Sequence, residues 1–231
     1  MYWWIAALFA FYLMHGIGSG CGAHRYFTHR SFRASAWAET VMAFLFTLAS
    51  SGSVIGYVLI HHKHHKNPDR EGDPHNPNQM GPLKTWLGIL DKRFLTIDPR
   101  AYMRLRSDRL LRFLHDYYFA VILSYCALIS LALGWQGFVF LYCIPVALQF
   151  QANSALIVLC HTKAIGYRRF ETADRSRNLR FPFRFWLLGE ELHNNHHYRP
   201  NSETMNVAGR WSEFDPLAVV IRYGLSQRTN A

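Results

Sequence analysis

Residues 117–160, YYFAVILSYCALISLALGWQGFVFLYCIPVALQFQANSALIVLC, contain no charged side chain. The stretches 117–133 and 138–160 are each close to the ~20 apolar residues that a helix needs to cross a bilayer. The residues GWQG between them predict a tight turn. This segment therefore predicts a helical hairpin in a membrane.

A third apolar segment begins the chain, at residues 2–23, and it carries no Lys, Arg, Asp or Glu. A cleaved signal peptide would have a basic region before the apolar run. Here the run starts at once and continues directly into HRYFTH at 24–29. We therefore expect residues 2–23 to be a membrane span of the folded protein.

The basic residues are distributed unevenly along the chain. Lys and Arg are absent from the first 24 residues and from residues 113–162, whereas residues 61–112 carry 11 of them. The positive-inside rule then predicts that residues 24–116 and 161–231 lie on the cytoplasmic side. We expect an integral membrane protein with its active site on that face.

The net charge of +10, from 25 Lys and Arg against 15 Asp and Glu, is compatible with nucleic acid, an anionic membrane or an acidic protein partner. The predicted topology accounts for most of this charge, and the sequence carries no nucleic-acid-binding motif. We therefore expect no nucleic acid partner. The four cysteines form no CxxC pair, which argues against a disulfide framework or a zinc ribbon.

Residues 36–60 form an apolar segment that is long enough for one crossing and too short for two. A single crossing would separate the histidines before it from those after it. If these histidines share one site, the segment is re-entrant or lies along the interface. Glu39 and the SSGS sequence at 50–53 favour that arrangement.

Histidine is the unusual residue, with 13 in the chain and eight of them at the motif positions of three short clusters. HRYFTH contains His24 and His29, while HHKHH at 61–65 and HNNHH at 193–197 share the pattern HxxHH. On a helix, positions i, i+3 and i+4 lie on one face, so each HxxHH presents three imidazoles in one direction. Five residues correspond to about 500° of helical rotation, so His29 is expected beyond a helix end.

One HxxHH motif alone is weak evidence for a metal, because isolated histidines near a membrane surface are usually polar interface residues. Three clusters on one predicted side favour metal binding, and eight imidazoles exceed what one zinc needs. We therefore expect two metal ions. For His15, His62 and His115 we expect ordinary packing or solvation instead.

The series HxxxxH, HxxHH and a distant HxxHH, between membrane hairpins, resembles the membrane-bound fatty acid desaturase family, and most closely its acyl-CoA (stearoyl-type, delta-9-like) branch. The resemblance extends from about Gly16 to Asp215. It includes HHKHHKNPDREGDPHNP at 61–77, GYRRFETADRSRN at 166–178 and GEELHNNHH at 189–197. The resemblance implies one domain over residues 1–231, an all-α membrane bundle whose cytoplasmic helical cap carries a di-metal site.

The family pattern also implies a ninth ligand shortly before a Gly-Tyr-Arg sequence, and His161 in CHTKAIGYR fits it. The family usually has an asparagine four residues before this histidine, where this chain has Ile157, and Asn153 lies eight residues before it. The family usually has two spans before the first box, where this sequence has one. The expected metal ligands are His24, His29, His61, His64, His65, His161, His193, His196 and His197.

Cleaving an unactivated alkyl C–H bond requires a redox metal, O2 as co-substrate and a supply of electrons. The resemblance thus implies two Fe ions, for which zinc can substitute as an artefact. The acidic residues near the boxes are candidates to accept hydrogen bonds from ligand histidines, although each equally fits an ordinary cap or surface carboxylate; they are Asp69, Glu71, Asp73, Glu190 and Glu191. Asp73 and Glu190 are the best of these, and Asn153 is a further candidate. Gln149 and Phe150 are candidates to line an acyl channel, although polar residues there equally fit contacts between helices.

The expected function is O2-dependent desaturation of a fatty acyl chain, carried as acyl-CoA or acyl-lipid. The sequence contains no fused electron carrier, so we expect a separate ferredoxin-, rubredoxin- or cytochrome-type donor, attracted by the basic cytoplasmic face. Two alternatives remain open from the residues. One is a membrane di-iron hydroxylase or ketolase of a lipid or carotenoid, and the other is a non-catalytic metal-binding protein of the membrane.

Overall fold

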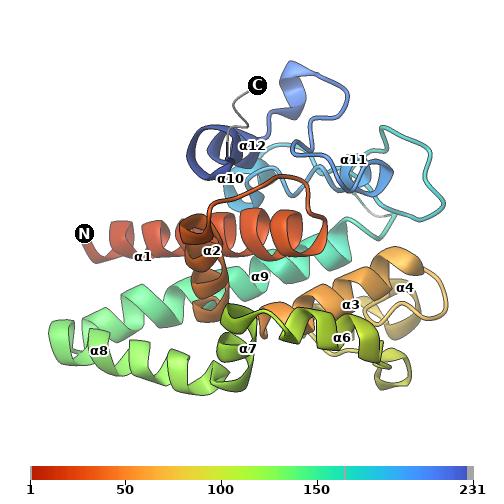
Figure 1. Ribbon diagram of the computed structural model, residues 1–231. Helices are drawn as coiled ribbons and strands as arrows, with labels where there is room; N and C mark the ends of the chain where they lie inside the picture. The colour runs from red at the N-terminus through yellow and green to blue at the C-terminus, as the bar shows by residue number, and fades with distance from the viewer. Residues whose placement is uncertain (1, 164, 228–231) are drawn as a thin grey trace.

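The computed structural model describes residues 2–163 and 165–227, which form helices and no β-strand (Figure 1). The predicted all-α class is confirmed. Two segments of the described chain are long and apolar enough to cross a membrane, Tyr2–Thr28 and Tyr118–Leu159.

The N-terminal helix consists of α1 (Tyr2–Tyr12) and its continuation η1 (Leu13–Thr28). Glycines on η1 allow α2 (Ala36–Leu48) to pack against it at very short range. A Cβ atom at Gly18 would lie only 2.6 Å from the backbone nitrogen of Phe46. Small residues thus let the two backbones approach, and both helices contribute side chains to the main hydrophobic core.

Residues 36–60 form parts of two helices, because the chain leaves the helical path after α2 and resumes at α3 (Val54–Lys66). The interruption includes the SSGS sequence, and Ser53 caps α3 by accepting a hydrogen bond from the backbone N–H of Gly56. The chain therefore changes direction between α2 and α3. That the pair does not cross the membrane stays a prediction.

The chain between the second box and the hairpin forms short helices that the sequence patterns did not predict. Most begin with an Asn or Asp whose side chain caps the first turn. They are α4 (Pro77–Met80), α5 (Pro82–Trp86), η2 (Lys92–Phe94), α6 (Pro99–Arg106) and α7 (Arg109–Asp116).

The apolar hairpin consists of α8 (Tyr118–Phe138), η3 (Val139–Cys143) and α9 (Ile144–Leu159). Gly134 interrupts it with φ 68° and ψ −164°, a conformation that glycine adopts without steric cost. The chain then folds back so closely that a Cβ atom at Gly137 would lie 2.7 Å from the carbonyl oxygen of Ile129. The turn lies within the predicted GWQG sequence, and Figure 1 shows the two arms.

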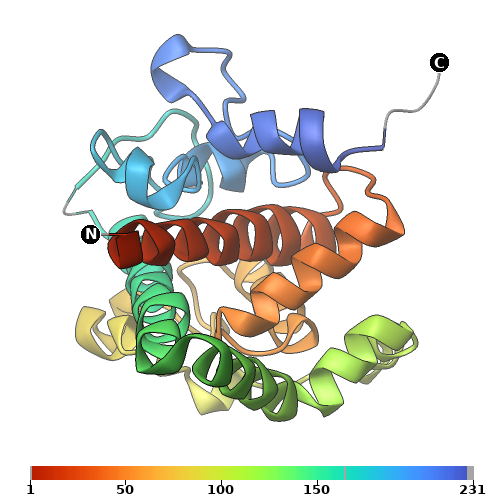
Figure 2. The same cartoon turned by 90° about the vertical axis from the view of Figure 1, so that its left-hand side faces the viewer.

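The C-terminal part covers the N-terminal helix. In Figure 2 its blue elements lie on one side of the dark red α1–η1 helix, and the green α8–α9 hairpin lies on the other. These elements are α10 (Phe183–Leu187), α11 (His193–Tyr198), η4 (Trp211–Glu213), α12 (Pro216–Val220) and η5 (Ile221–Leu225).

A buried ion network fastens this cover to η1. Arg25, 2% exposed, donates to Glu190 at 2.9 and 3.0 Å and to Asp215 at 2.8 and 3.1 Å. Because a buried guanidinium without counter-charges would be strongly unfavourable, the two carboxylates fix where the C-terminal part docks.

Candidate metal centre

The nine predicted ligand histidines lie together in two adjacent groups, in each of which the ring nitrogens are within 4.8 Å of one another. The five-histidine cluster consists of His24, His29, His61, His65 and His196. The four-histidine cluster consists of His64, His161, His193 and His197. The rings of His65 and His197 stack at 4.6 Å between centroids, so the clusters share a boundary.

Each HxxHH motif contributes to both clusters. The histidines at i and i+4 face one cluster and the histidine at i+3 faces the other, in opposite senses for the two motifs. At 3.6 residues per turn, i+4 lies about 40° and i+3 about 60° from i on opposite sides, so the three rings diverge. The expectation that the three imidazoles of one motif converge on one point is therefore wrong. Each motif contributes two histidines to one cluster and one histidine to the other.

The asparagines inside HNNHH hold α11 in position. Asn194 accepts hydrogen bonds from the backbone N–H groups of Arg169 and Phe170 at 2.7 and 2.8 Å. Asn195 donates to Glu213 at 2.8 Å and accepts from the Asn178 amide at 2.7 Å. Because these amides are buried and bonded, the helix that carries three of the histidines is anchored to the loops around it.

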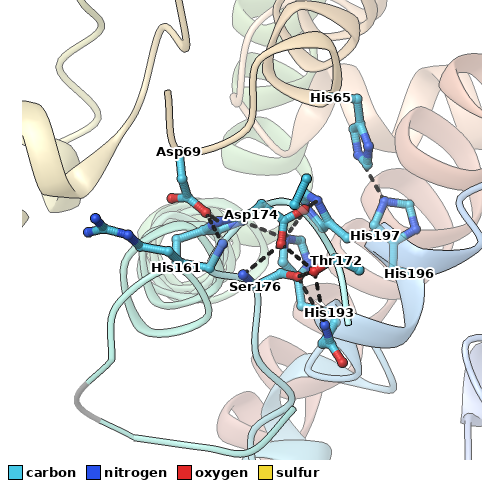
Figure 3. Close-up of polar contacts among 12 residues, drawn as sticks. His65, Asp69, His161, Thr172, Asp174, Ser176, His193, His196 and His197 are labelled. Carbon is cyan, nitrogen blue, oxygen red and sulfur yellow. Dashed lines mark hydrogen bonds and ion pairs between the residues drawn. The ribbon is translucent and has the colours of Figure 1, made fainter. Parts of the chain in front are cut away.

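Carboxylates orient four of the histidines through their Nδ1 atoms. His24 is bonded to Glu190, and His64 is bonded to Asp73 at 3.0 Å. Figure 3 shows the other two contacts, His161 with Asp69 at 3.0 Å and His197 with Asp174 at 2.9 Å. Each Nδ1–H donates to a carboxylate, which leaves the Nε2 lone pair directed into the cluster.

Burial keeps most cluster histidines neutral. Burial, followed by the nearby imidazoles, lowers the pKa of His29 to about 2 and that of His196 well below its usual range. Burial also lowers the pKa of His161, but the hydrogen bond and charge of Asp69 outweigh it and raise that pKa overall. Burial alone would raise the pKa of Glu190, whereas His24 and Arg25 lower it to about 2.

The donor set fits metal ions. The Nε2 atom of His193 lies 3.0 Å from that of His161 and 3.2 Å from that of His197, and both of these neighbours use Nδ1 as their donor. At most one of the two contacts can be a hydrogen bond, because His193 Nε2 carries at most one proton. Its Nδ1 atom is buried and has no partner among the described residues. Facing lone pairs of this kind are stabilised by a cation between them, and neutral imidazole suits iron or zinc.

A cavity of about 680 Å³ borders both clusters. His24 and His61 of the five-histidine cluster and His64, His161 and His193 of the four-histidine cluster contribute to its wall. From there it extends between α3 and one face of α9 to the α2–α3 turn. An elongated ligand in this cavity would pass directly beside the histidines.

The remaining predicted site residues have different surroundings. Asp73 and Glu190 contact histidines as expected. Asn153 lines the cavity, but its amide bonds Ser51 and Gln149 rather than a histidine. Phe150 lines the cavity, whereas Gln149 is fully buried and bonds His15 at 2.8 Å, which is a contact between helices.

Two residues of the site, Asp174 and His75, were missing from the predicted set, whereas Asp69 was among the predicted acidic candidates. Asp69 and Asp174 orient ligand histidines. His75 is buried, lines the cavity and has its ring 4.5 Å from that of His64. Asp69, Asp73 and His75 all belong to the stretch that follows the second box, so that stretch carried a signal for them. Asp174 lies 23 residues from its histidine, and no spacing rule connects the two.

Comparison with known proteins gives the same assignment as the histidine boxes. A profile of the fatty acid desaturase family matches residues 2–222. The chain belongs to this family. It is accordingly an enzyme, a fatty acyl desaturase, and the resemblance drawn from the three boxes is confirmed.

This desaturase is 31% identical to "Delta-9 acyl-lipid desaturase 2" of Arabidopsis thaliana, over 93% of this chain and 69% of that protein. It is also 31% identical to "sn-1 stearoyl-lipid 9-desaturase" of Synechocystis, over 94% of this chain and 67% of the relative. With "Hex-5-enoyl-[acyl-carrier protein] acetylenase" of Moorena producens it shares 26% identity, over 97% of this chain and 77% of the relative.

Proposed function

We propose that this desaturase introduces a double bond into a fatty acyl chain at a di-iron centre held by the nine clustered histidines. In the overall reaction, a –CH2–CH2– unit, O2, two electrons and two protons give –CH=CH– and two molecules of water. Bound iron would activate O2, the oxidant of this reaction, which no side chain of the protein can do. The observation that carries the proposal is the convergence of nine ring nitrogens in two adjacent clusters that both border one cavity.

The protein's own residues would orient the ligand histidines and enclose the acyl chain. Asp69, Asp73, Asp174 and Glu190 would fix the rings of the ligands through Nδ1 and raise their basicity. The α9 face, which includes Val146 and Leu156, supports an acyl chain as the occupant of the cavity. The names of the relatives support acyl-lipid as the carrier, and a relative from Choristoneura rosaceana named "Acyl-CoA Delta(11) desaturase" keeps acyl-CoA open.

Electrons would come from a separate carrier that docks near the four-histidine cluster. Asp69 bonds both His161 and the backbone N–H of Arg175, at 3.0 and 2.7 Å. The side chains of Arg175 and Arg70 are exposed beside it. An acidic ferredoxin-, rubredoxin- or cytochrome-type protein would be attracted to these charges. The positive-inside pattern supports a cytoplasmic location for this face.

The test is expression in a host that makes no unsaturated fatty acids, with a competent electron donor, followed by analysis of the fatty acids. We expect a new double bond at one position. A hydroxyl or keto product would point to the hydroxylase or ketolase alternative, and iron-loaded protein that consumes no O2 would support the metal-binding alternative. Either result would overturn the proposal.

A further inference from the structure

The cavity reaches the protein surface along the edge between α5 and α9. Residues that both line it and are exposed include Ala147, Phe150 and Gln151 on α9 and Gly88 shortly after α5. Gly52, at the α2–α3 turn, also lines the cavity and is exposed, at the end of the cavity that lies away from the histidines. The cavity therefore has a mouth whose walls are α5 with its following turn on one side and α9 on the other.

The α9 side of this mouth belongs to a segment that is apolar enough to cross a membrane. Gln151 precedes His161 by ten residues, which corresponds to about 15 Å along the helix axis. It lies well inside the apolar segment Tyr118–Leu159. A molecule that reached the mouth from outside would therefore approach through lipid rather than through water.

The rim of the mouth is apolar, with a positive charge among the apolar groups. Leu83, Leu87 and Ile89 are 71%, 55% and 47% exposed, and Lys84 is exposed between them. Apolar side chains next to lysine are the pattern of a segment at the membrane interface, where the apolar groups meet acyl chains and the ammonium meets lipid phosphate. The rim thus matches the chemistry of a lipid.

The end of the cavity at the histidines is closed. The lining residues there are the cluster histidines with His75 and Glu190, and all of them are buried beneath the C-terminal part. Two hydrogen bonds fasten the mouth itself. Trp86 Nε1 donates to Gln151 Oε1 at 3.0 Å, and Ser154 Oγ donates to the carbonyl oxygen of Trp86 at 2.6 Å. Widening the mouth would break these two contacts and leave the histidine end unchanged.

We propose that the acyl chain enters sideways from the cytoplasmic leaflet, between α5 and α9, while it is still esterified to a membrane glycerolipid. This inference rests on the proposed desaturase function, since it names the carrier for the same site. The lipid headgroup stays at the interface beside Lys84, and only the acyl chain passes Gln151 into the cavity.

The turnover test compares substrates and variants in lipid nanodiscs with iron-loaded enzyme and a competent donor. The wild type should desaturate the stearoyl chain of a nanodisc phosphatidylglycerol and leave added stearoyl-CoA unconverted. Ala147→Phe, which fills the mouth, should lower turnover at least ten-fold. Ala127→Phe places the same ring on an exposed position of α8 outside the cavity lining and should leave turnover unchanged.

A labelling test on the unmodified protein does not depend on turnover. A phosphatidylglycerol with a photoactivatable diazirine in its stearoyl chain should label the α5–α9 rim, and excess distearoyl phosphatidylglycerol should suppress the labelling. Labelling confined to the outer surface of α8 would overturn the inference.

The two proposals fail in different ways. Conversion of stearoyl-CoA alone, or full lipid turnover by Ala147→Phe, would overturn the sideways route and leave desaturation intact. Product from neither carrier would overturn the desaturase function, and the inference about the carrier would fall with it.

Discussion

The two histidine clusters differ in how many imidazoles they contain and in how many carboxylates hold those rings. In the four-histidine cluster, three of the four rings donate Nδ1 to an aspartate, namely His64, His161 and His197. In the five-histidine cluster, only His24 has a carboxylate partner among the described residues. That carboxylate, Glu190, also binds Arg25. One cluster has fewer imidazoles and three aspartates behind them, whereas the other has more imidazoles and one glutamate that also binds Arg25.

This difference indicates how each cluster would treat a cation. Carboxylates behind imidazoles raise ligand basicity and add negative charge near the metal. We therefore expect the four-histidine cluster to bind its ion at least as tightly as the five-histidine cluster does, although it has one imidazole fewer. We also expect its metal to have the lower reduction potential of the two.

Removal of His161 should have the largest effect. His161→Ala leaves the four-histidine cluster with three rings, so bound metal should fall from two ions per chain toward one, and turnover should fall at least 100-fold. Metal analysis of purified protein and an assay of O2 consumption check this. Each of the other eight ligands should show the same loss of turnover. Full activity with two retained ions in His161→Ala would place the ninth ligand elsewhere.

Replacement of the carboxylates that bond the histidines should have the second-largest effect, and the effect should differ between the two clusters. Asp174→Asn should weaken metal binding at the four-histidine cluster by about 10–100-fold with little change in folding. Glu190→Gln should weaken the other cluster and also lower the free energy of unfolding by about 1–3 kcal/mol, because Arg25 loses one counter-charge. Competition with a chelator and thermal unfolding in detergent measure the two effects. Equal stability of the two variants would contradict this distinction.

Acid should destabilise the metal-free protein. A histidine whose pKa is lowered in the folded state favours folding fully above pH 6.5, and that advantage is lost as the pH falls toward its folded value. Burial lowers the pKa of His29 to about 2 and that of His197 to about 3. The raised pKa of His161 acts in the opposite direction, but more histidines have a lowered pKa than a raised one. The histidines with a lowered pKa outside the spans are His29, His61, His65, His75, His193, His196 and His197.

Each such histidine costs up to about 1.4 kcal/mol per pH unit below 6.5. The midpoint of thermal unfolding of metal-free protein should therefore fall steadily from pH 6.5 to pH 4. Bound metal should suppress the slope, because a coordinated imidazole does not take up a proton. A midpoint that rises on acidification would contradict the assignment of neutral histidines.

The smallest effects are expected at histidines outside the clusters. His62 bonds the backbone carbonyl of Thr28 at 3.1 Å, and His115 bonds the hydroxyl of Ser53 at 2.7 Å. His62→Ala and His115→Ala should each cost about 1 kcal/mol or less and keep both metal ions and most of the turnover. Metal content distinguishes these variants from the ligand variants. Loss of an ion from His62→Ala would mean that the second box contributes a fourth ligand.

Short-range spacing predicted the parts of this molecule that depend on one helix. The two HxxHH motifs predicted six of the nine clustered histidines, and the apolar runs on either side of GWQG predicted the hairpin. The contacts of Asp174 with His197 and of Asp69 with His161 join residues 23 and 92 positions apart, so no periodicity reports them. The helices between residues 77 and 116 were missed because each depends on a local cap and on docking rather than on a long apolar pattern.

The ion network at Arg25 has a consequence for how the protein is made. Its two counter-charges follow it by 165 and 190 residues in the sequence. At ribosomal speeds of 5–20 residues per second, Arg25 emerges about 10–40 s before Asp215. During that interval the nascent chain holds an unneutralised guanidinium at the end of its first span. A chain that stops before Glu190 lacks both counter-charges of Arg25.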